Sequence, residues 1–117
     1  MNKREVGTDH ETMACDYLQR SGMRIICRNF RVKAGEIDII AQDGNVLVFV
    51  EVKYRSSMEY GGAQYAVSIK KQKKIVRVAQ WFMAKYKIPD DTYCRFDAVL
   101  IDGNDIIHIK NAWEKVC

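Results

Sequence analysis

The chain has 117 residues, a length that suits one domain built around a single hydrophobic core. Apolar residues make up 48% and charged residues 29%, which excludes a disordered tail, and no apolar run approaches the ~18 residues of a membrane-spanning helix. The net charge of +4, from 19 basic and 15 acidic side chains, allows a polyanionic partner without requiring one.

The N-terminal segment contains no apolar stretch of the signal-peptide type, so we expect a cytoplasmic protein with no membrane partner. The four cysteines are scattered, and no C-x-x-C is present, which excludes the spacing of a zinc site. We therefore expect free thiols that pack as small hydrophobic groups.

The hydrophobic periodicity predicts one mixed α/β domain, 1–117, with elements in the order α-β-β-β-α-β-β. Gly22 is expected to cap the first helix at its C-terminus and Ser68 to cap the second at its N-terminus. Asp43-Gly44 and the stretch 102–104 are turn signals between strands. The expected bounds are about 5–21 and 69–87 for the helices and about 24–32, 36–41, 46–55, 94–101 and 105–110 for the strands.

The hairpin formed by strands 36–41 and 46–55 carries charges inside its apolar runs. Because side chains alternate between faces along a strand, one face is expected to be apolar and the other charged. The apolar face holds Ile37, Ile39, Ala41, Val46, Val48, Val50 and Val52. The opposite face holds Leu47 and Phe49 together with the four charged residues Glu36, Asp38, Glu51 and Lys53.

If Asp43-Gly44 is the two-residue turn, Asp38 pairs with Phe49 and becomes a diagonal neighbour of Glu51, roughly 7 Å away at the backbone. Two carboxylates at that separation can converge on one divalent cation, and without a cation they raise each other's pKa. Lys53 relieves only part of this repulsion. The pattern alone leaves two interpretations open: a cation site, or an exposed sheet face carrying salt bridges.

The motifs GEID at 35–38 and VFVEVKYR at 48–55 resemble the active-site signature of the PD-(D/E)xK nuclease superfamily. Over nearly its full length the chain resembles the YraN-like family of small bacterial proteins of uncertain function. The supporting stretches are Tyr17-Leu18 with Gly22, Asn29-Phe30-Arg31, Lys71-Gln72 and Arg95-Phe96-Asp97. The resemblance implies a restriction endonuclease-like αβββαβ core, a central mixed sheet flanked by two helices, with an extra C-terminal strand here.

The superfamily resemblance also implies a function. It predicts a Mg²⁺- or Mn²⁺-dependent endonuclease whose partner is nucleic acid, DNA rather than RNA, including the branched or flapped DNA that Holliday junction resolvase-like members cut. The alternative is a catalytically inactive module of the same fold that binds nucleic acid or a protein partner. A homodimer is expected if two strands are cut symmetrically.

The resemblance assigns roles residue by residue. Asp38 would be the principal metal ligand and Glu51 the second, with the backbone carbonyl of Val52 joining them. Lys53 would hold the attacking water or stabilise negative charge on the phosphate. Glu11 matches an extra acidic residue of resolvase-like members, which makes it a further ligand.

Several of these residues have a second interpretation. Glu11 completes a capping box that begins at Thr8, so it is a site residue, a helix cap, or both. Glu36 either supports the site or forms a salt bridge. Lys71-Gln72 matches a superfamily position, and Gln72, at the head of the apolar stripe, is favoured for reaching the site.

A basic run occupies the start of the second helix, with five basic side chains in the eight positions 70–77. Such a run is either a solvated helix face or a track for a phosphate backbone. The aromatic and basic residues after the E-x-K motif either stack on unpaired bases or pack as an ordinary loop. Asp97 and Trp113 are expected to be structural, and His10 is a secondary site candidate. The nucleic-acid-binding candidates are Lys70, Lys71, Lys74, Arg55 and Tyr54.

Overall fold

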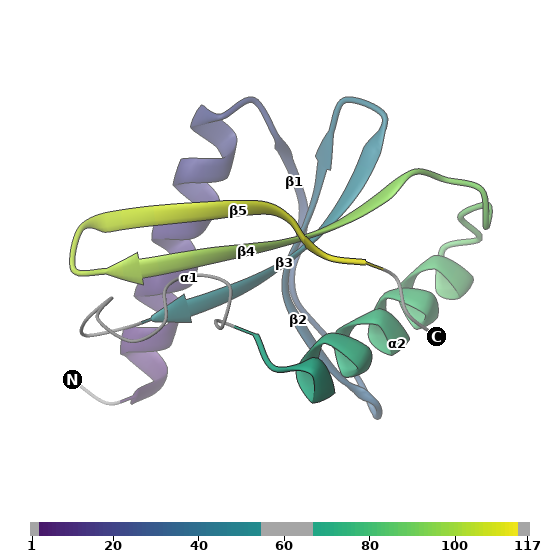
Figure 1. Cartoon of the computed structure of the whole chain (residues 1–117), viewed down its shortest axis with the longest axis horizontal. Coiled ribbons are helices and arrows are strands. Elements are labelled where there is room, and N and C mark those ends of the chain that lie inside the picture. Colours follow the sequence, from purple (N-terminus) through teal and green to yellow (C-terminus); the bar gives the residue numbers. More distant parts are fainter. Residues whose placement is uncertain (1–2, 55–66, 115–117) are drawn as a thin grey trace.

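A computed structural model describes residues 3–54 and 67–114. Its elements follow the predicted order, with a mixed sheet between two helices (Figure 1). The elements are α1 (Lys3–Arg20), β1 (Arg24–Val32), β2 (Gly35–Asp43), β3 (Val46–Tyr54), α2 (Ile69–Lys85), β4 (Cys94–Asp102) and β5 (Asp105–Trp113). Within these described ranges, no helix is long and apolar enough to cross a membrane.

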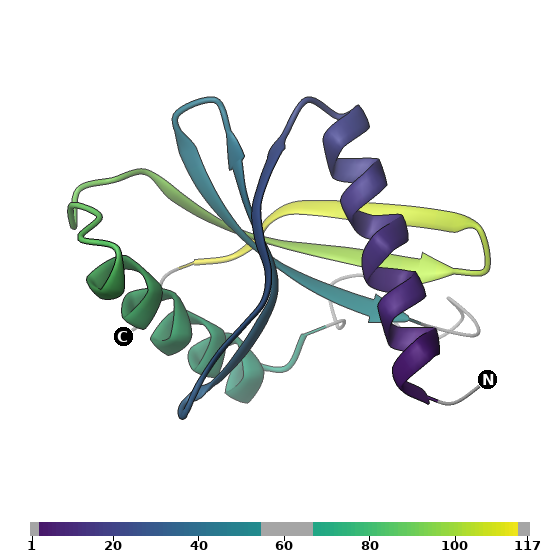
Figure 2. The same ribbon diagram turned by 180° about the vertical axis from the view of Figure 1, so that it is seen from behind.

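The five strands form one sheet in the order β1-β2-β3-β4-β5. Only β3 and β4 run parallel, because α2 makes the crossover between them, and all other neighbours are antiparallel. Figure 2 shows α1 lying across one face of the sheet, while α2 lies toward the other. The strand β5 is the predicted addition to the αβββαβ order.

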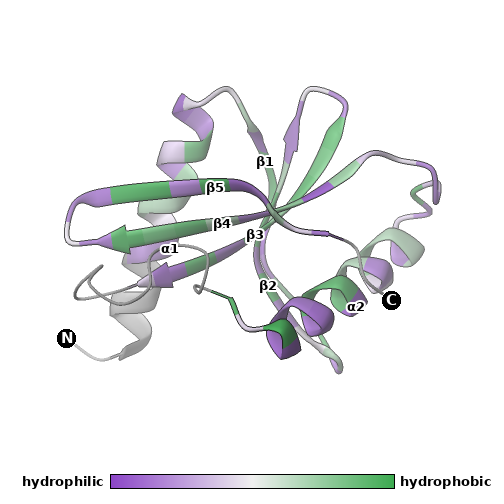
Figure 3. Ribbon diagram, viewed as in Figure 1, coloured by the Kyte–Doolittle hydropathy of each residue, from purple (hydrophilic) through white to green (hydrophobic). Residues whose placement is uncertain are grey.

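The sheet separates two hydrophobic clusters, one under each helix. The cluster under α1 contains the even-numbered valines of β3 together with Ala14 and Leu18, while the cluster under α2 contains Phe49, Ile75 and Phe82. The strands at the centre of the sheet are therefore mostly hydrophobic, whereas the first turns of α2 are hydrophilic (Figure 3). The predicted alternation along β3 is confirmed by this division.

The turn of the β2–β3 hairpin differs from the predicted one. Asp43 pairs with Val46, so the two loop residues are Gly44 and Asn45, not Asp43 and Gly44. Gly44 has a φ of 62°, which suits the first central position of a tight hairpin turn. The pairing is displaced by two residues, so Phe49 faces Ile40 instead of Asp38. A shift of two preserves the face of every side chain, whereas a shift of one would have reversed it.

Ile37 is the exception to the predicted faces, because it packs in the cluster under α2 and not with Ile39. On the neighbouring strand, Asn29 has a φ of 55° and interrupts the regular alternation of β1. Phe30 follows Asn29 and pairs with Ile37, and Phe30 also packs against the α2 cluster. The first residues of β2 therefore turn toward α2, and Asp38 lies at the bend.

The predicted caps of both helices are confirmed. Ser68 accepts a hydrogen bond from the backbone N–H of Lys71 at 3.2 Å, which begins α2. Gly22 has a φ of 97° and ends α1, and the Met23 N–H donates to the Leu18 carbonyl across it at 3.0 Å. The start of α1 differs from the prediction because this helix already begins at Lys3.

Candidate active site

The candidate site lies where β2 and β3 stop pairing. Their ladder ends at Ile39 and Val50, and the next residues outward are Asp38 and Glu51. Asp38 Oδ2 accepts a hydrogen bond of 2.8 Å from the backbone N–H of Val52. The Asp38 carboxylate thus accepts the Val52 N–H at the point where the β2–β3 ladder ends and no backbone carbonyl of β2 pairs with it. This hydrogen bond holds Asp38 beside Glu51.

Asp38, which is half-buried, and Glu51, which is buried, form a carboxyl pair. Burial raises the pKa of Glu51, the charge of Asp38 raises it further, and Lys71 offsets part of the effect, so that the pKa is about 7. Burial also raises the pKa of Asp38, while the Val52 N–H and a hydrogen bond with Glu51 oppose the rise. Glu51 is therefore only partly ionised near neutral pH, and in its protonated form the Glu51 carboxyl can donate a hydrogen bond to the Asp38 carboxylate.

Lys71, from the first turn of α2, supplies the cation of this site. Its Nζ lies 3.1 Å from Glu51 Oε1, and the Glu51 residue is only 4% exposed. The sequence argument favoured Gln72 for this position, but the Gln72 amide donates to the carbonyl of Val67 at 2.9 Å. Lys71 therefore contacts the carboxyl pair, whereas the Gln72 side chain bonds to the backbone just before α2.

Glu11 reaches toward the same pair from α1. The predicted capping box is wrong, because α1 begins at Lys3 and Thr8 lies inside the helix. Burial raises the pKa of Glu11, and the charge of Asp38 raises it further, although an Asn29 hydrogen bond and Arg28 act in the opposite direction. Within the described part of the chain, Oε1 of Glu11 is buried without a hydrogen-bond partner, and Arg28 Nη2 lies 3.9 Å from it, beyond hydrogen-bond range.

Glu36 and Lys53 lie at the margin of the site. Glu36 pairs with Arg31, whose Nε lies 2.8 Å from Glu36 Oε2, so the salt-bridge interpretation describes its contact. Its charge still raises the pKa of Asp38. Lys53 is half-buried on β3 and forms no ion pair with any other residue in the described ranges.

The remaining candidates divide between three places. Tyr54 is half exposed and stacks on His10, with ring centroids 4.1 Å apart, which joins the end of β3 to α1. Lys70 and Lys74 are exposed on α2. Arg55 lies outside the described residues.

The donor set of the site suits a hard divalent cation. Within the described part of the chain, no three His, Cys, Asp or Glu side chains are grouped as ligands of one metal ion. Mg²⁺, however, is commonly held by one or two carboxylates and keeps its other positions for water and phosphate oxygens. Asp38 and Glu51 meet that minimum. Glu11 supplies a third carboxylate, which interacts electrostatically with Asp38 and has one buried oxygen without a hydrogen bond in the described part of the chain.

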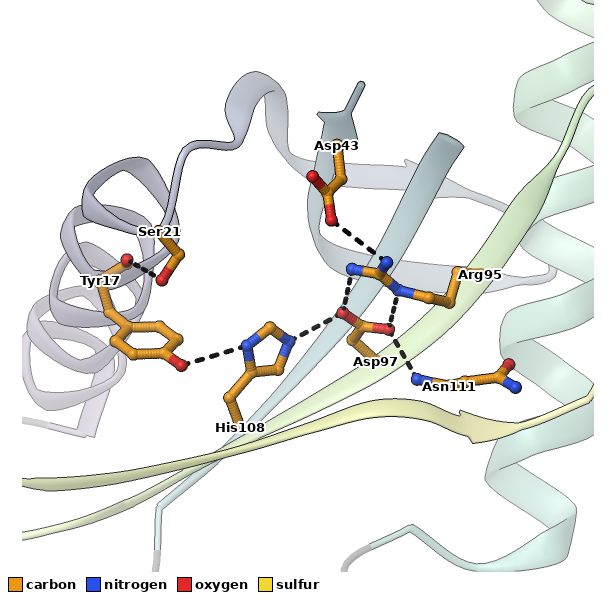
Figure 4. A network of polar contacts seen from close by, with 7 residues as sticks. All are labelled: Tyr17, Ser21, Asp43, Arg95, Asp97, His108 and Asn111. Atoms are coloured by element: carbon orange, nitrogen blue, oxygen red, sulfur yellow. Dashed lines mark hydrogen bonds and ion pairs between the residues drawn. The ribbon is translucent and has the colours of Figure 1, made fainter. Parts of the chain in front are cut away.

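A second polar cluster, at the centre of the molecule, ties α1 to the sheet (Figure 4). Asp97 is fully buried on β4 and accepts hydrogen bonds from three groups. Arg95 binds both of its oxygens, with Nε at 2.8 Å and Nη2 at 3.0 Å, and the Asn111 N–H donates at 3.0 Å. His108 Nε2 lies 2.7 Å from Asp97 Oδ2, and His108 Nδ1 lies 3.2 Å from the Tyr17 hydroxyl.

This network satisfies a charge that would otherwise be costly to bury. Burial alone would raise the pKa of Asp97, but the hydrogen bonds from His108 and Arg95 outweigh it and hold the pKa below 3.8. Tyr17 lies on α1, about 1.7 turns beyond Glu11, so the network fixes the helix that carries Glu11. No local signal could have paired Tyr17 with His108, since 91 positions separate them.

An αβββαβ core, with two carboxyl groups where its central strands separate, defines the restriction endonuclease-like class of α/β fold. The chain belongs to UPF0102, an uncharacterised protein family, which matches residues 10–101 and confirms the YraN-like resemblance.

Similarity to curated relatives extends over nearly the whole chain. The chain is 43% identical over 114 residues to a UPF0102 protein of Lachnoclostridium phytofermentans, covering 97% of each chain. It is 46% identical over 109 residues to a UPF0102 protein of Herminiimonas arsenicoxydans, covering 93% of this chain and 86% of the relative. A third relative, a UPF0102 protein of Caldicellulosiruptor saccharolyticus, is 44% identical over an alignment of 119 positions, gaps included, which covers 97% of this chain and 100% of the relative. The names of these relatives state no activity.

Proposed function

We propose that this protein is an endonuclease, dependent on Mg²⁺ or Mn²⁺, that hydrolyses phosphodiester bonds in DNA, including branched or flapped DNA. The observation that supports this function best is the carboxyl pair of Asp38 and Glu51. The buried carboxyl of Glu51 lies beside the half-buried carboxylate of Asp38 at a strand separation, and the pKa of Glu51 is about 7 as a result. Groups held in such an unfavourable arrangement are characteristic of functional sites.

The bound cation would lower the pKa of a water molecule and neutralise charge on the phosphate. Asp38 and Glu51 would hold it, and the protonated fraction of Glu51 would give up its proton as the cation binds. The carbonyl of Val52 and the carboxylate of Glu11 are the further oxygen donors nearby. Among the ligands, only Glu11 comes from outside β2 and β3.

The two lysines have different tasks in this proposal. Lys53 is two residues from Glu51 on the same strand, so its ammonium group can orient the attacking water or bind a phosphate oxygen. Lys71 neutralises Glu51 in the resting site, and it becomes available to the phosphate once Glu51 binds the cation. Positive groups placed where negative charge develops are the largest single contribution in many enzymes.

A binding module without catalysis is the second candidate, and one contact favours it. The ion pair between Lys71 and Glu51 already neutralises one carboxylate, so the site is electrostatically tolerable without a cation. In that case the same fold would bind nucleic acid or a protein and cut nothing.

Cleavage assays with matched variants decide between these functions. The wild type is incubated with Mg²⁺ or Mn²⁺ and with linear, single-stranded, flapped and four-way DNA, and with RNA. Asp38→Asn and Lys53→Ala are each expected to lose about 100-fold or more of the activity. The exposed residues Asp16 and Lys110 provide the controls Asp16→Asn and Lys110→Ala, which are expected to cut normally.

Cation binding is measured separately by titration calorimetry. Mn²⁺ should bind near pH 6.5 and release a proton, seen as a heat that depends on the ionisation enthalpy of the buffer. The Asp38→Asn variant should show neither effect. Activity that survives both Asp38→Asn and Lys53→Ala would refute the proposed site. A wild type that binds nucleic acid and cuts none of the substrates would establish the binding module instead.

A further inference from the structure

The outer face of α2 carries a stripe of exposed basic and aromatic side chains. The helix has six basic residues and no acidic one. At about 100° per residue, five exposed side chains fall within an arc of about 80° on the side away from the core. We call these five the α2 stripe: Lys70, Lys74, Arg77, Trp81 and Lys85.

Trp81 is the unusual member of the α2 stripe, because it is 58% exposed although the same helix buries six other hydrophobic residues. It borders a cavity of about 530 Å³ whose other described lining residues are Val32, Lys33 and Ala34, in and after the end of β1. This volume is in the range of sites that hold small organic groups. The lining is apolar apart from Lys33.

The connection between β1 and β2 packs directly on this part of the helix. The position of a Cβ on Gly35 would lie 3.2 Å from the Lys74 side chain and 3.3 Å from Val78. Lys74 therefore lies along the connection, between Trp81 and the beginning of the helix. The stripe and the cavity form one continuous surface.

This surface leads to the candidate active site. Lys71, in the first turn of the same helix, contacts Glu51. Trp81 is ten residues further along, which places it about 15 Å away along the helix axis. At the spacing of about 3.4 Å per nucleotide that a fully stacked strand keeps, this distance corresponds to four or five nucleotides, and an extended strand would need fewer.

We propose that the α2 stripe binds a single-stranded segment of nucleic acid, with its basic side chains on the phosphates and Trp81 stacked on an unpaired base over the cavity. The charge of the helix selects a polyanion, and an exposed tryptophan selects a strand whose base faces are accessible. The idea that the bound strand leads to Asp38 and Glu51 rests on the proposed function. The binding of a single strand by the α2 stripe is independent of that function.

A second copy of the chain is a poor occupant for this face. Symmetric dimers bring identical patches together, and here each patch would place Lys70, Lys74 and Arg77 against the same three charges. Like charges in direct opposition destabilise an interface. A strand of nucleic acid has the complementary charge along its whole length.

Tryptophan fluorescence tests the stacking directly, because the chain has only two tryptophans. Trp113 is 7% exposed and stacks on Phe96, so Trp81 is the one accessible to a ligand. Titration with oligothymidylate in EDTA, where no cation supports cleavage, should quench the wild type and leave Trp81→Phe unquenched. Equal quenching in Trp81→Phe would overturn the stacking.

Fluorescence anisotropy with labelled oligothymidylate measures the affinity. Trp81→Ala should weaken binding by about 5- to 150-fold. Arg77→Ala should lower the slope of log affinity against log salt by about 0.7, the effect of one lost phosphate contact on a single strand. Tyr93→Ala removes an aromatic group that is 70% exposed elsewhere, and Lys110→Ala removes an exposed charge on β5. Both controls should bind like the wild type.

Two further outcomes separate this proposal from the nuclease assignment. Binding that depends on Trp81 and Arg77, together with a wild type that cuts nothing, would retain the stripe and reject the nuclease. If the wild type cuts DNA, and the Trp81→Ala and Arg77→Ala variants bind oligothymidylate as tightly as the wild type, the nuclease would be retained and the stripe rejected. Sedimentation of a wild-type dimer that Trp81→Ala converts to monomer, without loss of oligonucleotide binding, would assign the face to subunit contact and overturn the proposal.

Discussion

Replacing Glu51 by glutamine should stabilise the cation-free protein at alkaline pH. In the folded chain the pKa of Glu51 rises from the ordinary 4.5 to about 7, because the carboxyl is buried beside Asp38. Each pKa unit is worth about 1.4 kcal/mol, so forcing the charged form costs on the order of 3 kcal/mol of unfolding free energy. Glutamine is neutral at every pH and avoids this cost, although it gives up the ion pair with Lys71.

The direction of the pH dependence follows from proton binding. Between pH 4.5 and about 7 the folded state retains a proton on Glu51 that the unfolded state has lost. The stabilisation is complete below 4.5 and disappears as the pH rises through 7. The wild type should therefore lose stability between pH 5 and 8, and Glu51→Gln should lose about 3 kcal/mol less.

Urea unfolding in EDTA at pH 5, 6, 7 and 8 measures this difference. Asp16→Asn, which changes an exposed carboxylate on α1, is the control and should follow the wild-type curve. Adding Mn²⁺ at pH 8 should stabilise the wild type and have no effect on Glu51→Gln. Parallel pH curves for the wild type and Glu51→Gln would refute the reasoning, since Glu51 would then carry no additional proton in the folded state.

Three other substitutions test the framework around the site. Asp97→Asn should lose about 3–5 kcal/mol in urea unfolding, because it removes the fully buried charge that Arg95 and His108 both contact and leaves Arg95, among the described residues, only its ion pair with Asp43. The wild type should also lose the contribution of Asp97 as the pH falls below 3.8, a loss that Asp97→Asn should not show in acid titration followed by circular dichroism. Phe49→Ala should lose about 3–5 kcal/mol by the same urea assay, since Phe49 is fully buried between Phe82 and Phe96. Ser68→Ala should lose about 1 kcal/mol in thermal unfolding, because it removes the side-chain cap of α2.

The sequence was sufficient for the order of the elements and for the faces of β3. Alternating valines with Leu47 and Phe49 between them can only divide between two sides of a sheet, and the two clusters confirm it. The turn between β2 and β3 was harder to predict, because Asp43-Gly44 and Gly44-Asn45 are both acceptable two-residue loops. Because of this error, Phe49 was expected to pair with Asp38, whereas it pairs with Ile40.

The parts that sequence reasoning missed depend on contacts between distant segments. Neighbouring helix positions differ by only about 100°, so the pattern could not decide whether Lys71 or Gln72 would reach Glu51. The positive φ of Asn29, which turns Ile37 toward α2, has no marker stronger than the residue type itself.

The division of the core has a consequence for how such a site can be adjusted. Glu11 is carried by the helix on one face of the sheet and Lys71 by the helix on the other, and each helix packs on its own hydrophobic cluster. The sheet, which supplies Asp38 and Glu51, lies between them as a common reference. A substitution under α1 can therefore change the acidic contribution without moving the lysine, and a substitution under α2 can do the opposite. The negative charge that Glu11 adds and the positive charge that Lys71 adds to the site can therefore be changed independently.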